Sequence, residues 1–310
     1  MSWIKRVNEL EIPTNVKMMV YGQPGAGKTT YALSAPSPIL LLDFDNGVRR
    51  IDKEHLKNTG TVQIPSWQVV LDVLSEDLTQ YKTIVIDTIG KMMDYIIAHK
   101  CGARAPRVND WNGINAEFST FVRRISELNI NIIFVAHRDT RREGDDIMFI
   151  PTLREKTYNS ILTELDLLGY IEMRTENGVT RRTVTFEPTS RNDGKNTCNL
   201  PFIMEIPMVI DRTGKLIKEN NTISKLVIEP YVLMLQLKKA ETEKYENIMK
   251  EIQEQIELVT DEVSANDFVS RIDAFGHVGS SKAMAAKLIQ AKALSLGLTL
   301  NKSKLYEKKV

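Results

Sequence analysis

The sequence predicts an α/β protein with a mostly parallel central sheet, followed by a small helical C-terminal region. Two patterns favour this class. Short apolar runs alternate with helix-like segments in the first half of the chain, and apolar residues recur every three or four positions near its end. A chain of 310 residues can hold one large domain and a smaller one. We expect an N-terminal segment over residues 1–15, an α/β core over 16–232 and a helical region over 233–310.

Four short runs are the expected parallel strands, at residues 16–21, 39–44, 83–87 and 131–136. Each is almost wholly apolar, as is usual for strands that are buried on both faces of a sheet. Helix-like segments separate them, for example residues 110–129. Strands that alternate with helices indicate a parallel sheet.

The later part of the chain changes character. Residues 168–174 and 179–186 flank the turn Glu176-Asn177-Gly178, and Asn-Gly between two such runs predicts an antiparallel hairpin. Beyond about Pro230 the pattern is helical, with one apolar face made by Tyr245, Met249, Ile252, Ile256 and Val259. We expect this face to pack against a later helix over 280–296, with an oligomer contact as the alternative. Residues 301–310 are expected to be a frayed, basic tail.

Composition excludes several classes of protein. The formal net charge of +1 gives no overall sign of a polyanionic partner, so any nucleic-acid contact must depend on local basic loops. No apolar stretch approaches the roughly 18 residues of a membrane helix, and the N-terminus lacks the pattern of a secretory signal. We therefore expect a soluble, cytoplasmic protein with no membrane contact. Cys101 and Cys198 stand far apart without a neighbouring histidine or second cysteine, which indicates neither a zinc site nor a disulfide framework.

The segment Gly22-Gln23-Pro24-Gly25-Ala26-Gly27-Lys28-Thr29 fits the phosphate-loop pattern G-x-x-x-x-G-K-[ST] and is followed by Thr30. It lies after an apolar strand and before a helix-compatible segment, as the motif requires. Its glycines let backbone N–H groups turn toward phosphates. We expect Lys28 to reach the β- and γ-phosphates and Thr29 to ligate Mg²⁺, so ATP and Mg²⁺ are the expected cofactors.

Three further side chains stand at or just after the ends of expected strands and so should meet at the same sheet edge. Asp87 is the expected second Mg²⁺ contact, unless it only caps the next helix. Asp45 could position the attacking water, with Asp43 as its rival and a turn role as the alternative. His137 could sense the γ-phosphate, although a lone histidine is often structural.

Two charged loops could touch nucleic acid. The basic loop 100–107 contains Arg104 and Arg107 and is followed by Trp111, a combination suited to tracking and stacking single strands. The mixed loop 138–146 contains Arg138, Arg141 and Arg142. Solvated loops are the alternative in both cases.

The segment 189–196 after the second hairpin strand carries Lys195 on an expected mobile turn. In ring or filament ATPases a neighbouring subunit inserts a cation toward the γ-phosphate. Lys195 is our candidate for such a finger, with an ordinary exposed turn as the alternative.

The order of these motifs resembles the RecA-like ATPase core. More narrowly, residues 22–30, 42–47, 85–88 and 134–137 resemble phage nucleotide-binding proteins of the RecA-core single-strand annealing type. The resemblance covers roughly residues 16–201. It implies ATP-dependent homo-oligomers, as rings or filaments, on single-stranded DNA, acting in phage recombination beside a single-strand-binding protein in the infected host's cytoplasm.

Carried over by residue, the resemblance puts Lys28 and Thr29 on the phosphates and Mg²⁺, and Asp87 on the metal. Asp45 stands where RecA-like enzymes hold a catalytic glutamate, and its shorter side chain predicts slow hydrolysis.

The sequence leaves two other functions open. One is an AAA-type remodelling ATPase or helicase loader that acts on a protein partner, which would need a C-terminal arginine sensor. Arg271 lies near a candidate helix but lacks a diagnostic context. The other is a small-molecule kinase, for which the sequence offers no compact set of lid arginines.

Overall fold

The computed structural model describes residues 11–211 and 213–308, so most of the expected N-terminal segment lies outside the described residues. Contacts divide the chain into two compact units. One unit is Pro13–Val232, and the residues from Leu233 onward belong to the other.

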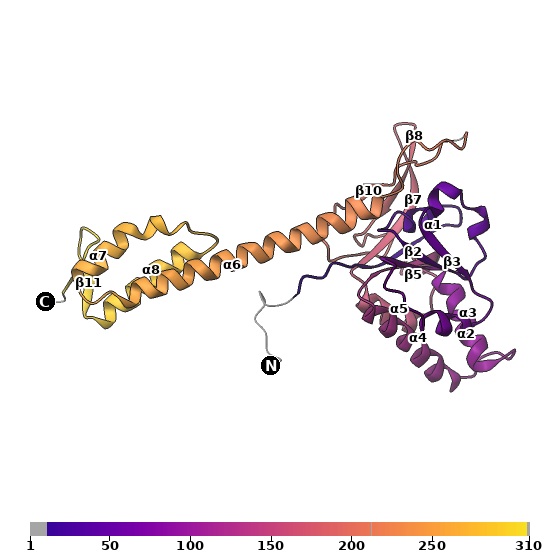
Figure 1. Ribbon diagram of the computed structural model, residues 1–310, viewed down its shortest axis with the longest axis horizontal. Coiled ribbons are helices and arrows are strands. Elements are labelled where there is room, and N and C mark those ends of the chain that lie inside the picture. Colours follow the sequence, from indigo (N-terminus) through magenta and orange to yellow (C-terminus); the bar gives the residue numbers. More distant parts are fainter. Residues whose placement is uncertain (1–10, 212, 309–310) are drawn as a thin grey trace. The chain divides into compact units, whose positions relative to one another are not determined.

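Among the described residues, ten strands of the first unit form one sheet with the order β10-β8-β7-β1-β5-β4-β2-β3, in which β6 pairs with β5 and β9 with β7. Figure 1 shows this sheet with helices on either side of it. The strands are β1 (Lys17–Gly22), β2 (Ile39–Asp43), β3 (Thr59–Gln63), β4 (Thr83–Asp87), β5 (Asn131–Glu143), β6 (Asp146–Pro151), β7 (Leu167–Glu176), β8 (Val179–Thr185), β9 (Lys195–Asn196) and β10 (Ile203–Glu205).

The central strands of this sheet, from β3 to β7 in the sheet order, are all paired in parallel. Strands β6, β8, β9 and β10 add antiparallel pairs. The structure thus confirms the predicted α/β class with a mostly parallel sheet. Parallel pairing also brings the carboxyl ends of β1, β2 and β4 to the same edge as His137 of β5.

Helices cover both faces of the sheet. On one face, α2 (Trp67–Val73), α3 (Ile89–Cys101), α4 (Asp110–Glu127) and α5 (Glu155–Glu164) enclose the larger apolar core. On the other face lie α1 (Lys28–Ala32), the short turns η2 (Val48–Arg50) and η3 (Lys53–Leu56), and the π-helical turn η4 (Ser224–Ile228). The predicted helix at 110–129 is confirmed as α4.

One predicted loop is wrong. Strand β5 was expected to end at Ala136, but it continues to Glu143 and turns back as β6, so residues 138–146 are mostly hairpin. Residues Arg138 to Arg142 show no apolar alternation, which is why the sequence did not indicate a strand there. The ladder with β6, from Arg138 opposite Pro151 to Glu143 opposite Asp146, holds them extended.

The predicted Asn-Gly hairpin is confirmed. Strands β7 and β8 pair antiparallel, with Glu176 opposite Val179. Asn177 and Gly178 both have positive φ, 51° and 75°, as a tight turn matching the twist of its strands requires.

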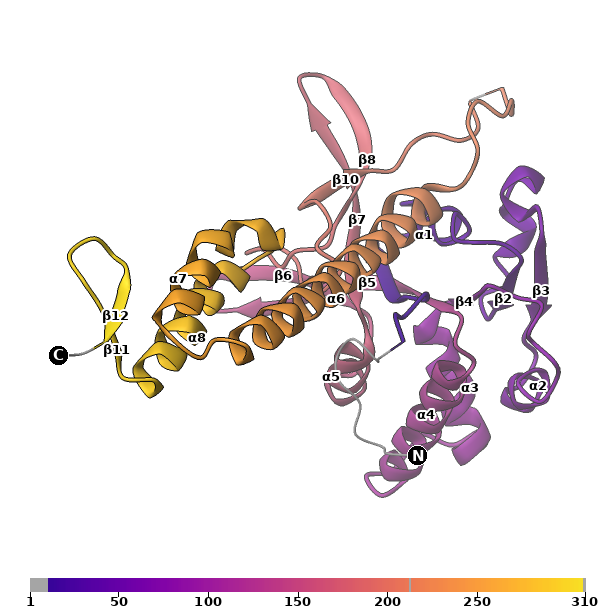
Figure 2. The ribbon, with the colours of Figure 1, turned by 60° about the vertical axis from the view of Figure 1, so that its left-hand side comes forward.

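The second unit is mainly helical and contains most of α6 (Glu229–Glu257), with α7 (Glu262–Arg271), the turn η5 (Ile272–Phe275) and α8 (Ser281–Ser295). Figure 2 shows α7 and α8 beside the C-terminal half of α6. Ile252, Ile256 and Val259 share a buried cluster with Ala285 and Ile289 of α8, which confirms the predicted helix packing.

The tail prediction is wrong as far as residue 308. Strand β12 (Tyr306–Lys308) pairs with β11 (Leu298–Leu300), and Tyr306 is buried in the cluster of the second unit. No helix within the described part of the chain is long and apolar enough to cross a membrane.

Candidate nucleotide-binding site

The phosphate loop joins β1 to α1. Gly25 and Gly27 have φ of 77° and 80°, in the left-handed region that favours glycine. Gly27 is restricted a second time, because a Cβ built there would stand 2.6 Å from Cζ of Arg182. The glycines therefore set the shape of the loop, and the side chain of Arg182, from the distant strand β8, packs against it.

Lys28 is the cation of the loop. Its side chain is buried, and Nζ donates a hydrogen bond to the carbonyl of Gln23 at 2.7 Å. Burial lowers the pKa of Lys28, whereas the carboxylates of Asp87 and Asp45 act in the opposite direction. The ammonium group is thus held inside the loop that would surround the phosphates.

Thr29 and Asp87 meet as the sequence predicted. Thr29 Oγ1 donates to Asp87 Oδ2 at 2.6 Å. Burial raises the pKa of Asp87 to about 6, with further increases from Asp45 and Asp43, although the bond from Thr29 acts against this. A cation placed beside this carboxylate would favour its charged form.

The pair fits Mg²⁺. Magnesium is usually held in nucleotide sites by one or two protein oxygens together with phosphate oxygens and water. The Thr29 hydroxyl and the Asp87 carboxylate would be those protein ligands. When bound, the ion would neutralise charge on the β- and γ-phosphate oxygens.

Asp45 and His137 form a second group at the same edge. Asp45 Oδ2 lies 3.6 Å from His137 Nε2 and accepts a hydrogen bond from Thr88 Oγ1 at 3.4 Å. Asp45 Oδ1 and His137 Nδ1 are buried without a hydrogen-bond partner among the described residues. Burial, together with the nearby Lys28, lowers the pKa of His137, although Asp45 acts to raise it. His137 is therefore neutral near pH 7, and the pair retains unused hydrogen-bonding capacity.

Asp43, the rival of Asp45, has a different role. Its Oδ1 accepts from the Gly47 N–H at 3.0 Å, and its Oδ2 accepts from the Val48 N–H at 3.2 Å. The side chain is only 1% exposed. Asp43 holds the turn after β2, so the geometry favours Asp45 as the carboxylate that faces a bound nucleotide.

Lys195 does not lie on a mobile turn. It belongs to β9 and pairs with Leu168, which itself pairs with Met19 in the first half of β1. Its Nζ donates to the carbonyl of Leu162 at 2.8 Å, at the C-terminal end of α5. Lys195 is thus bound to its own subunit and stands toward the opposite end of β1 from the phosphate loop.

Two of the candidate residues at the basic loop, Arg104 and Trp111, contact other side chains. Arg104 makes a bidentate pair with Asp110, at 2.5 and 2.9 Å. The guanidinium of Arg154 lies over the ring of Trp111, with Cζ 3.4 Å from the ring centroid. Arg107 is exposed. One face of Trp111 is therefore already covered.

The candidate arginines of the β5–β6 hairpin differ in their contacts and exposure. Arg138 donates to Tyr170 Oη at 3.0 Å and lies over the Phe149 ring. Arg141 lies 3.8 Å from an oxygen of Asp193. Arg142 is exposed.

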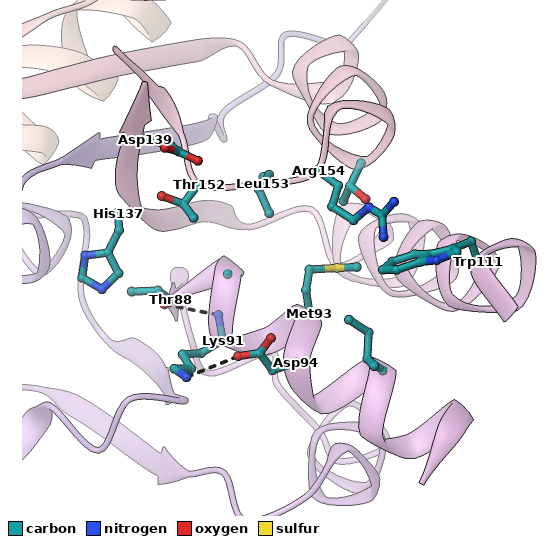
Figure 3. A pocket seen from close by; sticks show the side chains of 13 residues that line it. Thr88, Lys91, Met93, Asp94, Trp111, His137, Asp139, Thr152, Leu153 and Arg154 are labelled. Atoms are coloured by element: carbon teal, nitrogen blue, oxygen red, sulfur yellow. Dashed lines mark hydrogen bonds and ion pairs between the residues drawn. The ribbon is translucent and has the colours of Figure 1, made fainter. Parts of the chain in front are cut away.

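A cavity of about 530 Å³ borders His137 and Thr88. Figure 3 shows it between the start of α3, strand β5 and the segment before α5, with Trp111 and Arg154 at the end away from His137. Lys91 and Asp94 form an ion pair of 3.3 Å on its wall. The sequence did not indicate this cavity, because its lining comes from separate segments.

The fold and the site together define a class of protein. A phosphate loop after β1, a partly buried Thr29–Asp87 pair and a mostly parallel sheet are those of a P-loop NTPase. A family model described as an AAA domain matches residues 14–198, and the chain belongs to this family of P-loop ATPases.

Two solved structures of archaeal proteins are similar to the chain. One is a KaiC-like protein from Pyrococcus horikoshii, with 14% identity over 55% of this chain and 77% of the other, at a TM-score of 0.36. The other is the flagellar accessory protein FlaH from Methanocaldococcus jannaschii, with 14% identity over 65% of this chain and 93% of the other, also at 0.36. A search among curated proteins found no match.

Proposed function

We propose that this protein hydrolyses ATP, assembles on single-stranded DNA as a homo-oligomer, and promotes strand annealing or recombination in phage DNA metabolism. The observation that carries the ATPase part is the convergence of five side chains at one sheet edge: Lys28, Thr29, Asp45, Asp87 and His137.

Each of these groups has a chemical task in hydrolysis. Lys28 would stabilise charge on the phosphates, and Thr29 with Asp87 would hold Mg²⁺. Asp45 would orient the attacking water and accept its proton, for which its free Oδ1 is suited. His137 would donate its single N–H to the γ-phosphate through Nδ1, which has no partner among the described residues, while Nε2 stays beside Asp45.

The DNA part of the proposal rests on the position of the β5–β6 hairpin. His137 lies on β5, and the same strand continues directly into Arg138, Arg141 and Arg142. If loss of the γ-phosphate moves His137, the movement would therefore reach these arginines along a single strand, with no loop in between. The exposed cations Arg107 and Arg142 are the side chains we expect to contact the DNA backbone.

One observation favours the second candidate, an AAA-type remodelling ATPase or helicase loader that acts on a protein. Arg104, Arg138 and Trp111 already have protein partners, so less of the basic surface is available for DNA than the sequence indicated. A single-strand-binding protein is the partner that the resemblance implies under the first candidate.

The test measures phosphate release with and without single-stranded DNA, together with particle size by light scattering. We expect single-stranded DNA to raise both the rate of phosphate release and the particle size. Lys28→Ala should abolish the increase in phosphate release. Arg107→Ala and Arg142→Ala should weaken DNA binding and reduce its salt dependence. Lys287 is an exposed cation of α8, and Lys287→Ala serves as the control that should leave DNA binding unchanged.

Absence of DNA binding at low salt, with and without ATP, would exclude the first candidate. If the protein then recovers a replication protein in a pull-down, this result would support the second candidate.

A further inference from the structure

Arg182 of β8 lies at the level of the phosphate loop. It pairs with Met173 of β7, two residues beyond Ile171, which pairs with Gly22 at the end of β1. Because side chains alternate along a strand, Arg182 points to the same face as Val184. Val184 belongs to the apolar cluster that contains Ala26 of the loop, so Arg182 stands on the α1 face just past the end of β1.

The guanidinium of Arg182 lies against the phosphate loop itself. A Cβ built on Gly27 would meet its Cζ at 2.6 Å, its Nη1 at 2.7 Å and its Nε at 2.9 Å. Gly27 directly precedes Lys28. A second cation from a distant strand is therefore packed beside the cation that the motif provides.

This arginine has no counter-ion in the part of the chain that the structure describes. Its Nε is buried without a hydrogen-bond partner. Burial lowers the pKa of the guanidinium, and no carboxylate acts against that effect. Nearby arginines of β7 and β8 do have carboxylate partners. Arg181 pairs with Glu205 at 3.2 Å, and Arg174 pairs with Glu172 at 2.6 Å.

A partly desolvated guanidinium stays charged, since arginine does not lose its proton in proteins. Its charge is costly until an anion reaches it, and a bidentate donor suits phosphate oxygens well. We propose that Arg182 binds the polyphosphate of the nucleotide from within the same subunit, completing the anion site together with Lys28. This inference rests on the proposed nucleotide binding.

The sheet order indicates which phosphate Arg182 contacts. Strand β8 lies on one side of β1, whereas β2 and β5, which position Asp45 and His137, lie on the other. Arg182 thus approaches the nucleotide from the side opposite the water-positioning group. We assign it to the α- or β-phosphate, so ADP and ATP should depend on it equally.

The test compares the dissociation constants of ATP and ADP, by isothermal titration, for the wild type, Arg182→Gln, Arg182→Lys and the control Arg181→Gln. We expect Arg182→Gln to weaken both nucleotides about tenfold to a hundredfold, the range for one lost charge-assisted hydrogen bond. Arg182→Lys should fall between that variant and the wild type, and Arg181→Gln should match the wild type.

Thermal unfolding without nucleotide distinguishes binding from folding. Because Arg182 has no partner to lose, Arg182→Gln should unfold at the wild-type temperature or above it, and only the increase on adding ADP should shrink. If Arg182→Gln unfolds earlier, the comparison of ADP affinity is made with Arg182→Lys, which keeps the charge but not the planar fork.

Wild-type affinity in both Arg182 variants would overturn the assignment, as would an equal loss in Arg181→Gln. A loss confined to ATP would overturn the placement at the α- or β-phosphate. Failure of the wild type to bind either nucleotide would instead overturn the proposed function on which this inference rests.

Discussion

Replacing Asp45 by asparagine separates hydrolysis from binding. The amide keeps the shape of the side chain and can still accept the hydrogen bond from Thr88, which now measures 3.4 Å. It cannot accept a proton from water. We therefore expect turnover to fall while the affinity for ATP stays near that of the wild type.

The magnitude follows from the position of Asp45. A well-placed general base contributes about 10²–10⁴ in rate. Asp45 is 23% exposed, so water screens part of its effect, and we expect the lower end of that range. A loss of about a hundredfold corresponds to a barrier higher by about 2.7 kcal/mol.

The assay is single-turnover phosphate release, with the dissociation constant for ATP measured on the same preparation. Asp43→Asn is the matched control, because Asp43 accepts from two backbone N–H groups and should affect stability more than chemistry. Equal loss of binding and turnover in Asp45→Asn would mark Asp45 as structural. Unchanged turnover would remove it from the mechanism.

Two substitutions test the phosphate loop, and a further prediction concerns the buried Cys198. Lys28→Ala removes the buried loop cation, so ATP affinity should fall about a hundredfold in a titration, and unchanged affinity would contradict its role. Gly27→Ala places a methyl group at φ 80° against Arg182, and chemical denaturation should show a loss of about 1–3 kcal/mol. Burial raises the pKa of the Cys198 thiol to about 12, so alkylation at pH 8 should be slow until the protein unfolds. Because the unfolded thiol ionises first, Cys198 should also lower stability as pH rises above about 8.5, which pH-dependent melting of Cys198→Ala would check.

The sequence predicted the elements whose signal is local. The buried parallel strands appear as continuous apolar runs, and Lys28, Thr29 and Asp87 follow from one motif and one strand end. Strand β3 was missed because it begins Thr59-Gly60-Thr61 and lies at the sheet edge, where apolar residues are not required.

The remaining features depend on pairing between distant segments. The choice between Asp43 and Asp45 depended on which carboxylate the turn after β2 uses, and both residues fit the sequence pattern. The approach of Arg182 to Gly27 is fixed by the register of β7 against both β1 and β8. No property of residues 179–186 alone encodes that register.

The continuation of β5 past His137 has a consequence for signalling within the subunit. Up to Val135 the strand is clamped between β1 and β4, and beyond His137 only β6 pairs with it. Beyond that point the hairpin is held through β6, where Phe149 bridges to Asn192 and exchanges backbone hydrogen bonds with Arg191 and Asp193. A shift of the imidazole would therefore be passed along β5 and β6 to the segment from Arg191 to Asp193.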